Sequence, residues 1–146
     1  MAESVDKIMT KNVVVCSPDA SIMDAAKKMK DKTISSIVVV VDKKPIGIVT
    51  ERDFTSKVVS INMDTKKNAV NKIMTSPVIT IPPSTTIYYS NDYMNKKGFR
   101  RLPVVNESGE LIGIITQRDL LNYFTEQRKK FVMSNLSKDL RESYPI

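Results

Sequence analysis

The sequence predicts an α/β fold of the α+β sandwich type, with two β-α-β-β-α repeats related by a pseudo-two-fold axis, their sheets packed together and the helices outside. Two internal repetitions predict it. The stretch "GIVTERD" at 47–53 recurs as "GIITQRD" at 113–119. The stretch "VDKIMT" at 5–10 recurs as "VNKIMT" at 70–75. Two copies of one structural unit therefore account for nearly the whole chain.

The two copies change length at one place only. The offset between them is 65 residues from Val5 through Met29, and it becomes 66 between "VVDKKPIG" and "VVNESGELIG". A hairpin turn is expected at this point, between two apolar runs. A repeat whose length differs only at a turn is a repeat of structure as well as of sequence.

Each copy opens with a predicted strand and a helix. The β-rich runs "NVVVCS" and "PVITIP" predict the first strands, and the clusters "SPDAS" and "PPSTT" suit a helix entrance. In the first copy, four apolar side chains then recur at positions i, i+3, i+4 and i+7: Ile22, Ala25, Ala26 and Met29. The second copy keeps Ile87 and Met94 but places Ser90 and Asn91 between them, so its helical pattern is weaker.

Two strands and a final helix complete each copy. The predicted strands are "SIVVVV" and "IGIVT" in the first copy and "LPVV" and "LIGIIT" in the second, and the last helix begins at Thr-x-Arg-Asp. One copy of about 50 residues does not comfortably bury a core alone, whereas two packed copies do. We expect repeat one at 5–60, a polar linker at 61–69, repeat two at 70–125 and a helical tail at 126–146.

Composition narrows the possible function classes. The chain has no histidine and one cysteine, Cys16, which we interpret as a small strand residue. Ser-His-Asp triads and Cys-His pairs depend on imidazole, and zinc sites use imidazole or several cysteines as ligands. The four glycines include the two at the junctions, which leaves too few for a P-loop or a GxGxxG turn. We therefore expect no catalytic residue, no metal site and no enzymatic activity.

Targeting signals and charge favour a cytoplasmic protein with an anionic partner. The N-terminal "MAESVDKIMT" lacks the apolar core of a signal peptide, and the longest apolar run, Ile37 to Val41, is far shorter than the ~20 residues that span a bilayer. The formal net charge is +7, which favours nucleotides, nucleic acid or an acidic protein as partners. We expect no membrane partner.

The Thr-x-Arg-Asp junction has a structural and a functional interpretation. Structurally, Thr50 with Asp53, and Thr116 with Asp119, have the spacing of a capping box, worth ~1 kcal/mol. Functionally, the same helix N-terminus offers N–H groups and partial positive charge to a phosphate. The aspartate suits the vicinal hydroxyls of a ribose. Spacing alone leaves both interpretations open.

Together with "IMT" and with "RRLPVV" at 100–105, the two junctions resemble a tandem pair of cystathionine-β-synthase-type (CBS) domains, a Bateman module, here as a stand-alone protein. The resemblance covers Val5 to Phe124. It implies two packed sheets with a cleft on each side between the copies, and a disc-shaped homodimer of modules. In this family the clefts bind adenine nucleotides or S-adenosylmethionine, so the implied ligand is regulatory and no cofactor is required.

The resemblance also implies which residues bind the ligand. The aspartates take ribose hydroxyls, the threonines contact ribose or phosphate, and the arginines lie near phosphate. The base lies against the first strand of the same copy. The expected set in repeat one is Thr10, Val13, Val14, Ser36, Ile37, Thr50, Arg52 and Asp53. The expected set in repeat two is Thr75, Val78, Ile79, Arg100, Arg101, Leu102, Pro103, Thr116, Arg118 and Asp119.

The copies differ where Arg100 and Arg101 stand in place of Ser35 and Ser36. Two guanidinium groups offer charge-assisted hydrogen bonds to phosphate. The cleft of the second copy is therefore predicted to bind the more highly phosphorylated ligand, or the same ligand more tightly. The alternative is that both arginines lie on a solvated strand edge.

The leading interpretation is a non-catalytic regulatory module that senses AMP, ADP, ATP or S-adenosylmethionine, as in energy sensing, and signals to an unidentified effector protein by a change of conformation or assembly. One alternative is a nucleic-acid-binding protein that uses the basic surface, and another is a structural adaptor with empty clefts. The tail is suited to packing on the module, covering a cleft, contacting a second subunit or docking an effector. Its apolar residues are Phe124, Phe131, Val132, Leu136 and Leu140.

Overall fold

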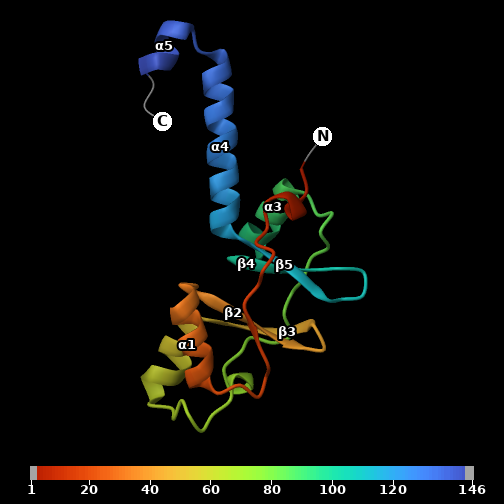
Figure 1. Ribbon diagram of the computed structural model, residues 1–146, viewed down its shortest axis with the longest axis vertical. Coiled ribbons are helices and arrows are strands. Elements are labelled where there is room, and N and C mark those ends of the chain that lie inside the picture. The colour runs from red at the N-terminus through yellow and green to blue at the C-terminus, as the bar shows by residue number, and fades with distance from the viewer. Residues whose placement is uncertain (1–2, 144–146) are drawn as a thin grey trace.

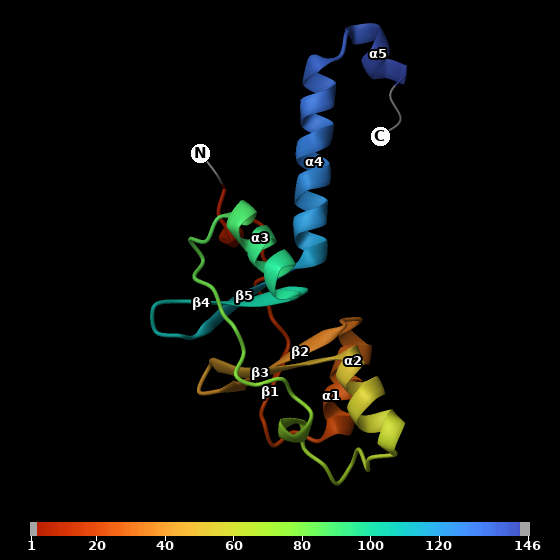
Figure 2. The ribbon, with the colours of Figure 1, turned by 180° about the vertical axis from the view of Figure 1, so that it is seen from behind.

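The structure is a computed structural model, and it describes residues 3–143. Two small sheets face each other in the middle of the body, with α1 and α2 beyond one sheet and α3 beyond the other (Figures 1 and 2). The long helix α4 leaves the body and carries α5 at its far end. The fold is thus the predicted sandwich of two β-α-β-β-α repeats.

The elements follow the predicted order. In the first half they are η1 (Val5–Lys7), β1 (Val15–Cys16), α1 (Ile22–Lys32), β2 (Ser36–Val41), β3 (Lys44–Thr50) and α2 (Glu51–Asp53), which continues as the π turn η2 (Phe54–Val58) and the 3-10 turn η3 (Val59–Ile61). In the second half they are η4 (Val70–Lys72), α3 (Ile87–Lys97), β4 (Arg101–Val105), β5 (Leu111–Thr116), α4 (Gln117–Asn135) and α5 (Lys138–Ser143).

Both central helices start at side-chain caps. The Ser21 hydroxyl accepts the Asp24 N–H at 3.0 Å at the start of α1, and the Thr86 hydroxyl accepts the Tyr89 N–H at 3.1 Å at the start of α3. The polar residue in the weaker pattern, Ser90, is fully buried and donates its hydroxyl to a carbonyl within its own helix. Because Ser90 is satisfied locally, the second helix forms despite its polar interruption.

The sheets bring the apolar strand residues together. β1 pairs parallel to β2, β2 pairs antiparallel to β3, and β4 pairs antiparallel to β5. In β2–β3 the pair Ile37 and Val49 is fully buried, as is the pair Leu102 and Ile115 in β4–β5. The extra residue of the second copy lies in its longer hairpin loop, 106–110, as predicted.

The predicted first strands are mostly absent from the described residues. Of "NVVVCS" only Val15–Cys16 pairs as a strand, and of "PVITIP" only Ile81 makes a bridge, to Val104. Two prolines, Pro77 and Pro82, lie at either end of the second run and have no N–H to donate to a ladder. The predicted first strand is therefore confirmed as a short paired strand in the first copy, and in the second copy it is reduced to a single bridge.

The opening turn of each copy belongs to the core of the other copy. Val5 is fully buried in the second repeat, where its N–H donates to the Thr85 carbonyl at 2.8 Å. Val70 is fully buried in the first repeat, where its N–H donates to the Ala20 carbonyl at 2.9 Å. The two repeats therefore exchange equivalent segments, and neither core is complete without the other half of the chain.

The repeated glycine and the repeated methionine meet at this exchange. A Cβ at Gly47 would lie 2.6 Å from Met74 Sδ and 3.1 Å from the Thr75 carbonyl oxygen. A Cβ at Gly113 would lie 2.4 Å from Met9 Sδ. The glycine of each junction thus makes room for the methionine of the other copy's "IMT".

The tail is helical but largely exposed. α4 runs well past the predicted end of the second repeat, and its last buried residue is Leu120. Phe131 is 70% exposed and Leu140 is 57% exposed. Within residues 126–143, the tail therefore covers neither core.

Candidate functional site

Two clefts lie between the repeats, and backbone bridges fix their walls. Thr10 exchanges two hydrogen bonds with Ile114 of β5, at 3.0 and 2.9 Å. Thr75 exchanges two with Ile48 of β3, at 3.1 and 2.9 Å. Each bridge sets the segment after one copy's opening turn beside the Thr-x-Arg-Asp junction of the other copy.

The larger cleft has a volume of about 920 Å³. One wall is the segment after η1 together with the edge of α1, and the opposite wall is the start of α4. The predicted residues that line it are Thr10, Val13, Val14, Ser36, Arg100, Arg101, Thr116 and Arg118. Its charged lining also includes Lys30 and Glu51, so four cations face one carboxylate.

The smaller cleft has a volume of about 590 Å³ and repeats this plan on the other side. The predicted residues that line it are Thr50, Arg52, Thr75, Val78, Ile79, Arg100, Arg101 and Leu102. Glu51 is again the single carboxylate, facing three arginines. Both clefts therefore combine an apolar wall with an excess of positive charge, which suits an anionic ligand with an apolar body.

The clefts group the predicted residues differently from the prediction. The segment of Thr10, Val13 and Val14 shares its cleft with Thr116 and Arg118, the junction of the other copy. Each opening segment thus lies beside the junction of the other copy, because the opening segments cross between the repeats before they reach the clefts. Where a base binds stays a prediction. The order of elements does not reveal the crossing, since it is the same with or without it.

Four predicted residues do not line either cleft. Ile37 is fully buried in the first core, and Pro103 is buried in β4. The carboxylates of Asp53 and Asp119 lie behind the threonines that do line the clefts. Each carboxylate accepts a hydrogen bond from the backbone N–H of its own junction threonine.

Both junctions form capping boxes. In the second copy the Thr116 N–H donates to Asp119 Oδ2 at 2.8 Å, and the Asp119 N–H donates to the Thr116 hydroxyl at 3.2 Å. In the first copy the Thr50 N–H donates to Asp53 Oδ2 at 2.9 Å. The structural interpretation of Thr-x-Arg-Asp is confirmed, and binding of a nucleoside phosphate at these residues stays a prediction.

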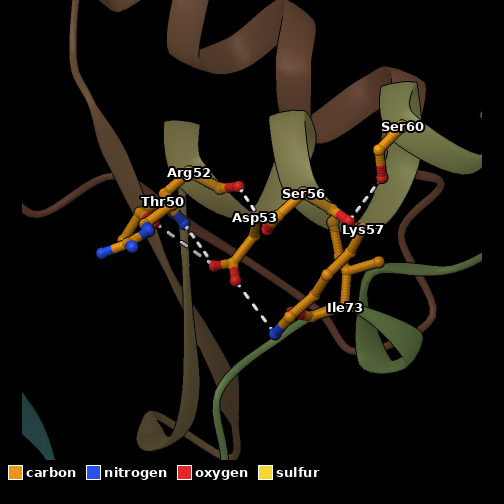
Figure 3. A network of polar contacts seen from close by, with 7 residues as sticks. All are labelled: Thr50, Arg52, Asp53, Ser56, Lys57, Ser60 and Ile73. Carbon is orange, nitrogen blue, oxygen red and sulfur yellow. Dashed lines mark hydrogen bonds and ion pairs between the residues drawn. The ribbon is translucent and has the colours of Figure 1, made fainter.

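The first-copy carboxylate has a second partner (Figure 3). Lys57 Nζ lies 3.0 Å from Asp53 Oδ1 and also donates to the Ile73 carbonyl at 2.9 Å, while Asp53 is only 7% exposed. Tyr123 stands at the equivalent place after Asp119, and Asp119 is half-buried. Among residues 3–143 Asp119 has no ion-pair partner, so the second-copy carboxylate keeps more of its bonding capacity than Asp53 does.

Arg101 lies on a wall that both clefts share. Four residues line both of them: Ser35, Glu51, Arg100 and Arg101. Arg101 is half-buried, its Nη2 donates to the Ser35 hydroxyl at 3.2 Å across the repeats, and its buried Nε has no partner within the described chain. Burial, then the neighbouring Arg100, lowers the pKa of the Arg101 guanidinium, and Glu51 opposes this shift.

This position corrects the assignment of the two arginines to the second copy alone. Because Arg100 and Arg101 line both clefts, they cannot by themselves make one cleft prefer the more phosphorylated ligand. The solvated-edge alternative describes Arg100, which is exposed, but not Arg101.

Sequence reasoning missed other lining residues. Lys30 on α1 and Phe99 before β4 reach the clefts only through tertiary packing. Glu51 lies at the variable position of Thr-x-Arg-Asp, where the second copy has Gln117. A difference in charge between two copies of a motif was the available signal for Glu51.

Other chemistry is sparse in the part of the chain that the structure describes. No group of three or more acidic or cysteine side chains in residues 3–143 is arranged to hold a metal ion. Over the same range no helix is long and apolar enough to cross a bilayer. Cys16 is buried in the first core, and burial raises the pKa of its thiol.

Comparison with known proteins identifies both halves. The CBS domain family matches residues 5–65 and 70–126. An uncharacterized protein of Methanopyrus kandleri is 34% identical over 140 residues, which cover 95% of this chain and 69% of that protein.

Two solved structures carry adenosine compounds. A CBS domain pair in complex with 5′-methylthioadenosine and S-adenosyl-L-methionine has a TM-score of 0.79 and 27% identity, and the match covers 87% of this chain and 99% of that one. CBSX2 in complex with AMP has a TM-score of 0.74 and 27% identity, with 86% and 98% covered.

Proposed function

The chain belongs to the CBS-domain family as a tandem pair of its domains, and on that premise we propose that it is a non-catalytic regulatory module whose clefts bind an adenosine ligand. Two solved relatives of the same fold are complexes with AMP and with S-adenosyl-L-methionine. The observation that selects between these is the charge of the clefts. Cations outnumber Glu51 in both, as three arginines and a lysine in the larger cleft and as three arginines in the smaller one, which favours the phosphates of AMP, ADP or ATP over a cationic sulfonium.

The lining suggests how a nucleotide is held in the larger cleft. Val13 and Val14 offer the apolar wall for the base, and Arg101 and Arg118 offer guanidinium groups for the phosphate. Thr116 and, behind it, Asp119 stand at the helix N-terminus for the ribose. We propose Asp119 as the better ribose carboxylate of the two, because Asp53 is already paired with Lys57.

Ligand binding would act by shifting the packing of the two repeats. Each cleft has walls from both copies, so a bound nucleotide contacts both and favours one relative placement. We propose that a second copy of the chain, as a homodimer, and an effector protein read this state. Light scattering after gel filtration, with and without AMP, measures the assembly.

A thermal-shift panel tests the ligand. AMP, ADP, ATP, S-adenosylmethionine and GMP are added separately, and a ligand at 100 times its Kd stabilises by about 2.7 kcal/mol, or roughly 5–10 °C for a chain of this size. We expect the adenine nucleotides to raise Tm most. If no adenosine compound shifts Tm, the proposal is wrong.

A matched pair of variants locates the effect. Arg118→Gln removes a guanidinium from the larger cleft, whereas Arg128→Gln removes one from an exposed position further along α4. The first is expected to reduce the affinity for AMP by about tenfold or more, and the second to leave it unchanged. Equal effects of both would indicate non-specific attraction by net charge.

A further inference from the structure

The two clefts share a wall made of Ser35, Glu51, Arg100 and Arg101, so a ligand in one cleft lies next to the wall of the other. Ser36 and Arg101 are equivalent positions of the two copies, since Ser36 pairs with Thr50 and Arg101 with Thr116. The repeat symmetry therefore provides two equivalent places, of which Arg101 lines both clefts and Ser36 lines the larger one only. One holds a small hydroxyl and the other holds a half-buried guanidinium.

Arg101 crosses from its own copy to the other. Its Nη2 donates to the Ser35 hydroxyl of the first repeat at 3.2 Å, and the small side chains there leave it room. A second arginine at the equivalent place would bring two like charges together on this wall, where the neighbouring Arg100 already lowers the Arg101 pKa. The two clefts thus share the single half-buried guanidinium of Arg101.

The guanidinium has unused bonding capacity. Its Nε is buried and unpartnered within the described residues, and its charge is balanced in part by Glu51, which lines the same two clefts. A buried donor without an acceptor is costly, so an anionic group that reaches this wall gains a charge-assisted hydrogen bond. Arg101 lines both clefts, so its guanidinium faces a ligand in either one.

We propose that the two clefts compete for Arg101, so that a phosphate-bearing ligand in one cleft weakens the binding of a second one in the other. The inference rests on the proposed function, because it needs a ligand with an anionic group. The first phosphate pairs with the shared guanidinium and offsets its charge. The second phosphate then meets a wall whose charge is already neutralised, at a cost of about 10- to 150-fold in affinity, the worth of one such bond.

The competition is a coupling between sites and is measured as such. Asn12 lines only the larger cleft and is exposed, and Ile79 lines only the smaller cleft and is 40% exposed. Asn12→Trp fills the larger cleft with an indole and Ile79→Trp fills the smaller one, each at a site outside the core. Each variant therefore binds ligand only in its other cleft. Calorimetric titration of these variants with AMP gives the association constant of each cleft alone. Titration of the unmodified chain gives the overall constant for filling both clefts, which is the product of its two stepwise constants.

The product of the two single-cleft association constants is expected to exceed the overall constant of the unmodified chain by about 10- to 150-fold. With adenosine, which has no phosphate, the two values should agree within error. Adding Arg101→Gln to each protein should remove the discrepancy for AMP. The two stepwise binding constants of the unmodified chain should lie further apart for AMP than for adenosine, and this comparison needs no variant, so it stands even if one substitution disturbs folding.

Two results overturn the inference while leaving the proposed function intact. Agreement of the two values for AMP means that the clefts are independent. A discrepancy that persists with Arg101→Gln means that the coupling runs through another route. Absence of binding by AMP and adenosine alike would overturn the proposed function and this inference together.

Discussion

Substitution of the two junction glycines tests whether the exchange of segments holds the repeats together. At Gly47 an added Cβ would meet Met74 Sδ at 2.6 Å, Met74 Cγ at 3.0 Å and the Thr75 carbonyl oxygen at 3.1 Å. At Gly113 the three nearest atoms are all in the Met9 side chain, at 2.4, 2.9 and 3.0 Å. The two sites thus differ in what must move.

The difference sets the expected order of the effects. Methionine is flexible, so Met9 is able to change rotamer, whereas the Thr75 carbonyl accepts the Ile48 N–H at 3.1 Å and cannot move without losing that bond. Overpacking costs about 1–3 kcal/mol, and we expect Gly47→Ala near the upper end and Gly113→Ala near the lower end. Each kcal/mol lowers Tm by roughly 2–4 °C in a chain of this size.

The assay is thermal unfolding followed by circular dichroism, as a double-mutant cycle. Met9→Ala in the Gly113→Ala background should relieve most of the clash and recover the stability lost to it, with a coupling energy of at least about 0.5 kcal/mol. Met74→Ala should recover less of Gly47→Ala, because the Thr75 oxygen remains. Gly98→Ala is the control for backbone strain without overpacking, since nothing lies within 4 Å of its added Cβ and its φ is +71°; its cost should not change when Met9 or Met74 is replaced by Ala.

The reasoning is refuted by either of two results. One is a Gly47→Ala protein that melts within 1 °C of the unmodified chain. The other is strict additivity of Gly113→Ala and Met9→Ala, which would mean that the two side chains do not meet in solution.

Three further predictions follow from single contacts. Lys57→Met removes the partner of Asp53 and should lower the free energy of unfolding in urea by about 1 kcal/mol, a value discounted because the lysine side chain is 43% exposed. Lys129→Met, at an exposed pair, should cost less than half of that. Equal costs would refute a stabilising role for the Lys57–Asp53 pair. The raised pKa of Cys16 means that the unfolded thiol ionises first, so the unmodified chain should lose stability relative to Cys16→Ala as pH rises past the ordinary thiol value of 9.0, and a flat difference would refute burial. Deletion from Leu136 onward removes a helix without buried residues and should change Tm by less than about 1 °C, whereas a larger loss would place the tail against the body.

Local pattern was enough to predict the elements and their order. The stripe that begins at Ile22 and the caps at Ser21 and Thr86 act within one or two turns of helix, so their outcome does not depend on the rest of the chain. The first strands could not be predicted in the same way. A strand exists only where a neighbour accepts its hydrogen bonds, and proline at Pro77 and Pro82 limits what that segment donates.

The grouping of the site residues depended on tertiary structure. Each cleft joins the segment after one opening turn to the junction of the other copy, because Thr10 bonds to Ile114 and Thr75 bonds to Ile48. The sequence held one unused sign of this exchange. Glycine and methionine both recur in each copy, and a fixed glycine with a bulky fixed partner indicates a close approach between segments far apart in the chain.

The exchange also bears on how a ligand could act through this fold. The two bridges at the clefts contribute four backbone hydrogen bonds, which at about 1 kcal/mol net each sum to about 4 kcal/mol. A nucleotide at 100 times its Kd contributes about 2.7 kcal/mol, which is of the same order. A ligand that contacts both walls of a cleft therefore has enough energy to favour one placement of the repeats over another, whereas the two cores, each of which buries apolar residues from both halves of the chain, need far more to rearrange. The contact between the repeats, and not the interior of either repeat, is where we expect the response to a ligand.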